Sequence, residues 1–275
     1  MLRLSRLYPL HLVTLLAVAV GQAIYWHLNH SYFVIRYNDA YHFVLNLLFA
    51  SSWGLEKDHS FNGPFWSVSV EALLYAVFFI VCYLRPPRLR LTLLMCGLGL
   101  ALWPLYPPVA HGIFCFFLGG AVCLAYRRTP PLRRPGLLLA LLLPLWLIPL
   151  LAAAIPAVAS APRFAPLASM LMRALVFPGT IYALAVYECA RGTFGKPLAI
   201  LGDISYSTYL LHFPLQLALV LGASACGIGL GAFRSAYALL GFMALLLAIS
   251  YASHRGLEMP AQRWMRRRWL RRPVS

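Results

Sequence analysis

The chain has 275 residues, of which 61% are hydrophobic and 11% are charged, and its formal net charge is +16 at pH 7. Soluble domains are usually about 45–50% apolar and about 25% charged, so this composition excludes a soluble globular enzyme and a disordered chain. The apolar runs are continuous rather than alternating, which argues against a transmembrane β-barrel. We therefore predict an all-α fold, a polytopic helical membrane bundle.

The basic excess is explained by the same fold. Lys and Arg of membrane proteins gather in cytoplasmic loops, so we expect no nucleic-acid partner. The six cysteines lie in or near apolar runs and form no CxxC pair. They indicate neither a disulfide framework nor a metal site, and we expect no metal.

Eight apolar segments come close to the roughly 17–25 helical residues that cross a hydrocarbon core about 30 Å thick. A further apolar stretch, 41–53, has only thirteen residues, so we expect a short interfacial or re-entrant helix there. The predicted spans are 9–26, 68–84, 91–106, 109–126, 137–155, 167–187, 203–221 and 236–254.

The first predicted span follows Arg3 and Arg6, which are three residues apart and share a helical face. Paired guanidinium groups suit phosphate oxygens, so Arg3 and Arg6 are candidates for binding a phosphate. The alternative is that they belong to the ordinary positive charge of a cytoplasmic segment. The basic start, the apolar run and the small residues near Gly21 also resemble a signal peptide. We prefer a span because the rest of the chain is itself polytopic.

The second predicted span begins after a turn at 62–64. Ser67, Glu71 and Tyr75 follow at four-residue spacing and share one helical face. Glu71 is expected about one turn inside the membrane, where an ionisable group is costly and therefore a functional candidate. The alternative is a carboxylate that caps the helix or pairs with an arginine.

The predicted span 203–221 carries a polar stripe on one face of an otherwise apolar helix. Pro214 removes one backbone hydrogen bond and is expected to kink the helix beside His212. An unperturbed histidine titrates near neutral pH, so His212 is a candidate for proton transfer, and the alternative is a satisfied core histidine. The stripe consists of Ser205, Tyr209, His212 and Gln216.

Charge orients the predicted bundle. With the N-terminus in the cytoplasm, the cytoplasmic segments hold eighteen Lys and Arg and the outer segments hold four. Counting 41–53 as a ninth span would remove this positive-inside asymmetry. We therefore predict both termini in the cytoplasm, with Arg173 and Glu188 as snorkelling or interface residues.

The last fifteen residues form a predicted basic cytoplasmic tail, 261–275, after a transmembrane domain at 1–260. Six arginines lie within 263–272, with Trp264 and Trp269 between them. Such a segment can lie on anionic lipid of the inner leaflet. The alternative is a simple stop-transfer flank.

Five sequence blocks between residues 3 and 260 carry a family resemblance. They are RLSRLYPLHL (3–12), NLLFASSW (46–53), PFWSVSVEALLY (64–75), LGDISYSTYLLHFPL (201–215) and LEMP (257–260). In this order they resemble acyltransferase family 3, a family of membrane O-acyltransferases that modify cell-surface polysaccharides and related glycans.

The resemblance implies a set of site residues, because the family's RxxR, WSxxxE and SYxxYLxH motifs each have a counterpart here. The catalytic residues that it implies are Glu71 and His212. The substrate-binding residues that it implies are Arg3, Arg6, Trp66, Ser67, Tyr206 and Tyr209.

The chain departs from the family pattern at its start. Family members typically have two further spans before the first block, with an Arg and a His separated by ten residues and the His proposed as catalytic. No Arg here is followed by a His eleven positions later. The resemblance thus implies an N-terminally incomplete domain, with a late start codon, a truncated gene or a degenerate member as the alternatives.

The implied activity is transfer of an acyl group from acyl-CoA, a cosubstrate rather than a bound cofactor, to a hydroxyl of a cell-envelope glycan or lipid-linked saccharide at the bacterial inner membrane. On the predicted topology Arg3 and Arg6 face the cytoplasm, Glu71 lies near the outer face and His212 lies between them. The alternative is a degenerate accessory subunit or a lipid-linked glycan transporter, since polar stripes also line transport paths.

Overall fold

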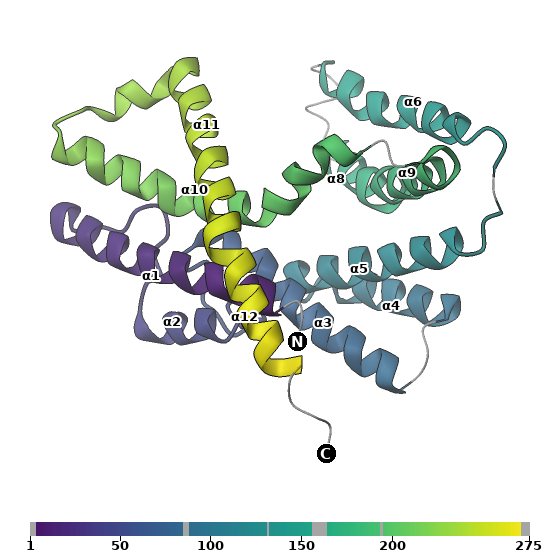
Figure 1. Ribbon diagram of the computed structural model, residues 1–275, viewed down its shortest axis with the longest axis horizontal. Coiled ribbons are helices and arrows are strands. Elements are labelled where there is room, and N and C mark those ends of the chain that lie inside the picture. Colours follow the sequence, from purple (N-terminus) through teal and green to yellow (C-terminus); the bar gives the residue numbers. More distant parts are fainter. Residues whose placement is uncertain (1–3, 85–87, 131, 156–163, 193–194, 271–275) are drawn as a thin grey trace. The chain divides into compact units, whose positions relative to one another are not determined.

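The computed structural model describes residues 4–84, 88–130, 132–155, 164–192 and 195–270, so Arg3 lies outside the described residues. All regular structure within these ranges is helical, which confirms the all-α prediction. The chain divides into two compact units, residues 1–72 with 198–275, and residues 73–197. Figure 1 labels the helices of both units.

Seven helices among the described residues are long and apolar enough to cross a membrane, which supports a multi-pass membrane protein. The short apolar stretch predicted at 41–53 forms the eight-residue helix α2 (Ala40–Leu47), not a span. The seven candidate spans are Ser5–Asn29, Gly63–Leu84, Pro107–Tyr126, Gly136–Ala153, Phe164–Arg191, Ala199–Ala225 and Ala236–Met265.

The predicted span 91–106 is wrong in its extent. α4 (Leu89–Leu102) has 14 residues, about 21 Å at 1.5 Å per residue, and is shorter than the hydrocarbon core. Pro104 has no N–H to donate to the Leu100 carbonyl, so α4 ends at Leu102, and Pro107 and Pro108 then open α5 (Pro107–Tyr126). The location of the two termini stays a prediction.

The first unit contains the helices that carry most of the sequence motifs. Four long helical segments, α1, α10, α11 and α12, form its frame around the shorter elements (Figure 1). Its elements are α1 (Leu4–Asn29), α2, η1 (Gly63–Phe65), the first turns of α3 (Trp66–Leu84), α10 (Ala199–Ala225), η4 (Leu230–Arg234), α11 (Ala236–Ser253), η5 (His254–Glu258) and α12 (Met259–Leu270).

Helices α1 and α10 pack along each other and run in the same direction. Leu7 contacts Tyr206 near the start of both helices, and Gly21 lies against Leu217 further along. A Cβ atom at Gly21 would lie 2.6 Å from Leu217 Cδ2, so glycine permits the close approach. The buried apolar cluster of this interface is Leu15, Val18, Phe61, Phe213 and Leu217.

Two π-helical turns each lie just before a proline. η2 (Met172–Val176) precedes Pro178, and η5 precedes Pro260. A proline cannot donate to the carbonyl four residues earlier, and its ring clashes with that carbonyl, so the helix widens locally. The chain stays helical through η5, and α11 and α12 form one long helix (Figure 1).

The second unit is an apolar helical group. Helices α4 and α5 form a hairpin with a close approach at Gly99, where a Cβ atom would lie 2.6 Å from the Phe114 backbone nitrogen. Small residues at such contacts are typical of membrane helices, which associate through close packing. Besides these two helices the unit contains the rest of α3, α6 (Gly136–Ala153), α8 (Phe164–Leu171), η2 and α9 (Phe177–Arg191).

Candidate functional site

Tyr206 lies where charged side chains from three other elements converge. Its hydroxyl donates to the Leu7 carbonyl at 2.6 Å, which ties α10 to α1. The charges of Glu258, Glu71 and Arg6 all lie close enough to act on the Tyr206 phenol. The structure therefore brings together two of the family's charged motifs, on α1 and α3, at a tyrosine of the third.

The order of these groups along α10 differs from the sequence-based expectation. The Arg6 guanidinium donates to the Asp203 carbonyl at 3.4 Å, and the charge of Glu71 acts on Tyr206, less than one turn further along. His212 lies six residues beyond Tyr206, about 9 Å along the helix. The prediction that His212 lies between Arg6 and Glu71 is therefore wrong, because α3 runs antiparallel to α10 and carries Glu71 back toward Arg6.

Ser67 and Tyr209 form a direct pair across α3 and α10. Their hydroxyl oxygens are 2.8 Å apart, and the Tyr209 hydroxyl lies 2.7 Å from the Pro64 carbonyl. A carbonyl only accepts, so Tyr209 donates its single hydroxyl proton to Pro64 and accepts from Ser67. The hydroxyl protons of Tyr206 and Tyr209 are thus both engaged by backbone carbonyls, and these tyrosines fix α10 to its neighbours.

Pro214 has a structural consequence that involves Asn62. A proline at 214 leaves the Leu210 carbonyl without its helical N–H partner. The Asn62 side-chain amide donates to this carbonyl at 3.0 Å, and Asn62 is fully buried. The segment before α3 is therefore docked on α10 at the point where proline exposes a hydrogen-bond acceptor.

His212 has a defined tautomer in this arrangement. Its Nδ1 lies 2.6 Å from the Tyr209 carbonyl, and a carbonyl can only accept, so Nδ1 carries the proton of the neutral ring. Nε2 is then a proton acceptor. The ring is partly exposed, which is the state a proton-transfer group requires.

The other predicted site residues occupy the start of α3. Trp66 opens the helix and is 38% exposed, with its ring 6.4 Å from that of His59. Glu71 is partly buried one turn after Ser67. The structure thus gives Trp66, Ser67 and Glu71 partly accessible positions on one short stretch of helix.

Sequence reasoning missed His11, which is fully buried in α1. Its Nε2 donates to the Asn46 carbonyl at 2.9 Å, and its ring stacks on Phe65 with centroids 3.6 Å apart. Phe49 packs edge-on against the same ring. His11 holds the segment after α2 against α1, and its place within an otherwise apolar span was the available signal.

Sequence reasoning also missed Glu258, although it belongs to the LEMP block. Its carboxylate is buried and accepts a hydrogen bond from Ser207. Its other oxygen lies 3.5 Å from His254 Nδ1. A carboxylate close to the end of a long apolar run was the signal that could have identified it.

Asp39 and His42 form a pair outside the candidate spans. His42 Nδ1 lies 2.8 Å from an Asp39 carboxylate oxygen, and the Lys57 N–H points to His42 Nε2 at 3.3 Å. The His42 backbone N–H donates to the same carboxylate and, as the largest cause, holds the pKa of Asp39 below its usual range. Both ring nitrogens of His42 are engaged by the protein, so this pair caps α2 rather than acting on a substrate.

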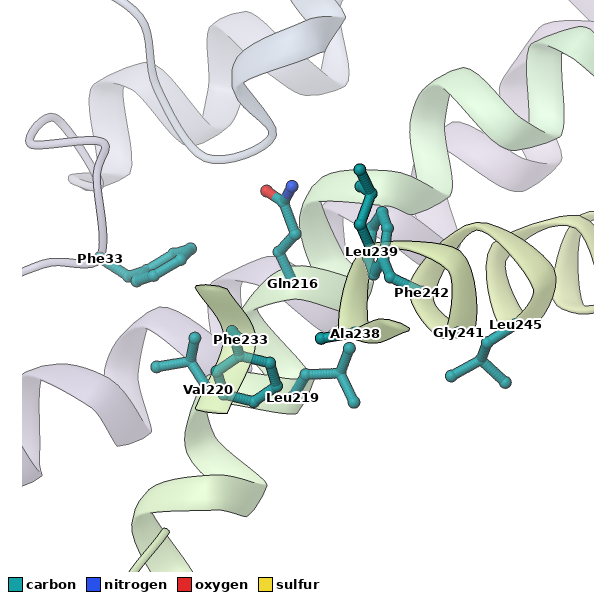
Figure 2. A pocket seen from close by; sticks show the side chains of 10 residues that line it. All are labelled: Phe33, Gln216, Leu219, Val220, Phe233, Ala238, Leu239, Gly241, Phe242 and Leu245. Atoms are coloured by element: carbon teal, nitrogen blue, oxygen red, sulfur yellow. The ribbon is translucent and has the colours of Figure 1, made fainter. Parts of the chain in front are cut away.

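A cavity of about 510 Å³ lies between α10 and α11. Figure 2 shows Gln216, the last residue of the predicted polar stripe, beside the apolar side chains of Leu239 and Phe242. The volume of this cavity falls within the range of small-molecule sites. Its mostly apolar lining suits an aliphatic group better than a sugar.

The second unit has a separate polar contact. Arg173 Nη1 lies 2.9 Å from His111 Nε2, and the Trp103 ring packs edge-on against the histidine. A guanidinium only donates, so His111 accepts. Arg173 thus has a partner within its own unit. Among the described residues, no group of three or more His, Cys, Asp or Glu could hold a metal ion.

The comparisons with known proteins give one match. A family model described as an acyltransferase domain, that of acyltransferase family 3, covers residues 1–255. No curated protein and no solved structure matches the chain. The covered range includes every predicted site residue, whereas Glu258 lies beyond it.

Proposed function

The chain belongs to acyltransferase family 3, and on that premise we propose that it moves an acyl group from acyl-CoA to a hydroxyl of a cell-envelope glycan or polysaccharide. Its place of action would be the bacterial inner membrane, where cytoplasmic acyl-CoA and a lipid-linked or growing glycan can both reach a membrane enzyme. Acyl-CoA would act as a cosubstrate, not as a bound cofactor.

One observation carries the proposal: hydrogen bonds join the three helices that bear the family motifs, α1 to α10 through Arg6 and Tyr206, and α3 to α10 through Ser67 and Tyr209. Ionisable side chains within membrane helices are costly and are retained where they serve a ligand or a proton path. A cation and a carboxylate around one partly buried point offer an anchor for an anionic donor and a partner for a hydroxyl acceptor.

The proposed reaction is an acyl transfer. The acceptor hydroxyl oxygen attacks the thioester carbonyl carbon, the carbon–sulfur bond breaks, and the CoA thiolate leaves. The hydroxyl proton passes to a protein base and then to the thiolate. Such a step requires a positioned donor, a base within reach of the hydroxyl and stabilisation of the tetrahedral oxyanion.

The chain's own residues supply two of these roles. Arg6, with Arg3 beside it in sequence, would bind the phosphates of the acyl-CoA through guanidinium N–H donors. His212 Nε2 is a proton acceptor when the ring is neutral, and Glu71 carries a carboxylate near Tyr206. Either group would orient the acceptor hydroxyl or take its proton, while Trp66, Ser67 and Tyr209 would line the approach.

The test is glycan acylation in a bacterial strain that lacks its own enzyme of this kind. The chain, and a form extended by any in-frame upstream codons, would be expressed there and the glycans analysed by mass spectrometry. We expect acylation that falls by about 10²–10⁴ in Glu71→Gln, because the substitution keeps the side-chain shape but removes the carboxylate. Glu188→Gln, on α9 of the second unit, is the matched control and should retain activity.

Two outcomes would contradict the proposal. Full acylation by both Glu71→Gln and His212→Ala would remove these residues from the reaction. No acylation by either form of the chain would instead favour the alternative, a degenerate accessory subunit or a lipid-linked glycan transporter. Movement of labelled lipid-linked glycan across vesicles that contain the chain would then support the transporter.

A further inference from the structure

Glu258 is a buried carboxylate that the proposed reaction does not use. It is the last residue of η5 and only 2% exposed. Burying a carboxylate in a membrane helix is expensive unless it is paired, so its position demands a partner or a function. It belongs to the LEMP block, but none of the site roles that the resemblance implies falls on it.

The partners of Glu258 come from two helices. The Ser207 hydroxyl of α10 donates to Oε1, and Ser207 is itself completely buried. His254 Nδ1 lies 3.5 Å from Oε2, a distance that allows an ion pair when the ring is protonated, although the pair lacks hydrogen-bond geometry. The hydrogen bond to Ser207 is thus the directional contact that joins η5 to α10.

The π-helical turn explains why the carboxylate faces inward. Each residue turns an α-helix by about 100°, so the wider turn before Pro260 rotates Glu258 relative to a regular helix. π-turns are frequent at functional sites because they re-aim a side chain at the cost of helix regularity.

Ser207 connects this carboxylate to the candidate site. It adjoins Tyr206 in the chain, so its hydrogen bond to Glu258 acts on the same turn of α10 as Tyr206. Tyr206 is held at its hydroxyl by the Leu7 carbonyl. Two hydrogen bonds from consecutive residues of α10, Tyr206 to α1 and Ser207 to η5, therefore define the rotation of this helix.

We propose that Glu258 is a positioning residue for acyl transfer: it holds Ser207 and so fixes Tyr206 where Arg6 and Glu71 meet. This inference rests on the proposed function. It makes the Ser207–Glu258 hydrogen bond part of the catalytic architecture rather than a helix contact of purely structural value.

The first measurement is the acylation kinetics of Glu258→Gln, Ser207→Ala and the double variant, with purified protein in nanodiscs. Because a hydrogen bond to a charged group is lost, we expect kcat to fall about 10-fold to 100-fold in each single variant, with the KM for acyl-CoA nearly unchanged. The double variant should be no slower than the worse single variant, because both remove the same contact. Thr208→Val, at the next position on α10, is the matched control.

The second measurement does not depend on activity. 3-Fluorotyrosine is incorporated at position 206, and its fluorine resonance is recorded in the wild-type background and in each variant. The resonance should move in Glu258→Gln and in Ser207→Ala, and it should stay in place in Thr208→Val. If Glu258→Gln does not accumulate in the membrane, Ser207→Ala carries both measurements, since it leaves the carboxylate in place.

These outcomes separate the two proposals. An unmoved fluorine resonance in the Ser207 and Glu258 variants overturns the positioning role whatever the activity. A moved resonance with unchanged kcat also overturns it, because Tyr206 would then be positioned without effect on the reaction. If the wild-type chain acylates no glycan, the proposed function fails, and the resonance alone decides whether Glu258 positions Tyr206.

Discussion

The two units of the chain differ in what holds them together. Among the described residues, every buried polar side chain belongs to the first unit except Thr92. In the second unit, α6 buries no residue at all, and α4 and α5 associate through the close approach at Gly99. Side-chain hydrogen bonds occur in both units, but among the described residues the first unit buries far more of its polar side chains.

This difference supports the proposal that the first unit carries the activity. Buried polar groups are expensive in a membrane protein and persist where they are paired or used. In the first unit they include Asn62, Ser207 and Glu258, each bonded to another segment of the chain. The predictions that follow test whether the polar unit alone carries activity and whether each unit depends on its own kind of contact.

The largest expected effect is the difference in acylation activity between variants of two histidines, one in each unit. His212→Ala should lower glycan acylation by about 10²–10⁴, because it removes a candidate proton acceptor. His111→Ala in the second unit, which removes the partner of Arg173, should lower it by less than tenfold. Mass spectrometry of the acylated glycan checks both variants. Equal losses would show that the division between a catalytic and a structural unit is false.

The hydrogen bond from Asn62 to the Leu210 carbonyl should stabilise the first unit measurably. Asn62→Ala leaves the Leu210 carbonyl buried without a donor, and we expect a loss of about 1–3 kcal/mol in the free energy of unfolding. Adding Pro214→Ala to the Asn62→Ala variant should restore much of this stability, because alanine supplies a backbone N–H for the Leu210 carbonyl.

Thermal denaturation in detergent, followed by circular dichroism, measures the effect of Asn62→Ala. Asn29→Ala is the control, since Asn29 is exposed and its side-chain amide donates to the Tyr25 carbonyl of its own helix. A double variant with Pro214→Ala that is no more stable than Asn62→Ala would contradict the proposed link between the proline and the amide.

The stability of the second unit should depend instead on the size of the side chains where its helices approach closely. Gly99→Ala places a Cβ atom against the Phe114 backbone, which cannot move aside, and should cost about 1–3 kcal/mol. Gly97→Ala on the same helix meets nothing within 4 Å and should be neutral or slightly stabilising. The same denaturation experiment compares them, and equal melting temperatures would refute close packing at Gly99.

The smallest effect concerns the cap of α2. The pKa of Asp39 is lowered in the folded state, chiefly by the His42 backbone N–H, so its stabilisation is fully present above the unfolded value of about 3.9 and is lost as the pH falls through the folded value. The melting temperature of wild type should exceed that of Asp39→Asn slightly at pH 7. This margin should shrink below about pH 4, and a margin that grows on acidification would contradict the assignment.

The sequence predicted the helical fold and most span positions because apolar length depends on bilayer thickness and can be read locally. It failed at 91–106, where Pro104 ends the helix that apolar composition alone would extend. Motif order made Glu71 and Tyr206 predicted site residues, but it did not single out Glu258. No local pattern shows that a carboxylate fifty-one residues beyond Ser207 bonds to it.

By itself, the amino-acid sequence determined that this chain is helical, enters a membrane many times and resembles an acyltransferase, because composition, run length and motif order are properties of neighbouring residues. Only the tertiary structure decided which polar groups meet. Whether Arg6 and Glu71 lie together or on opposite sides of His212 depends on helix direction and rotation, and these follow from packing between segments far apart in the chain.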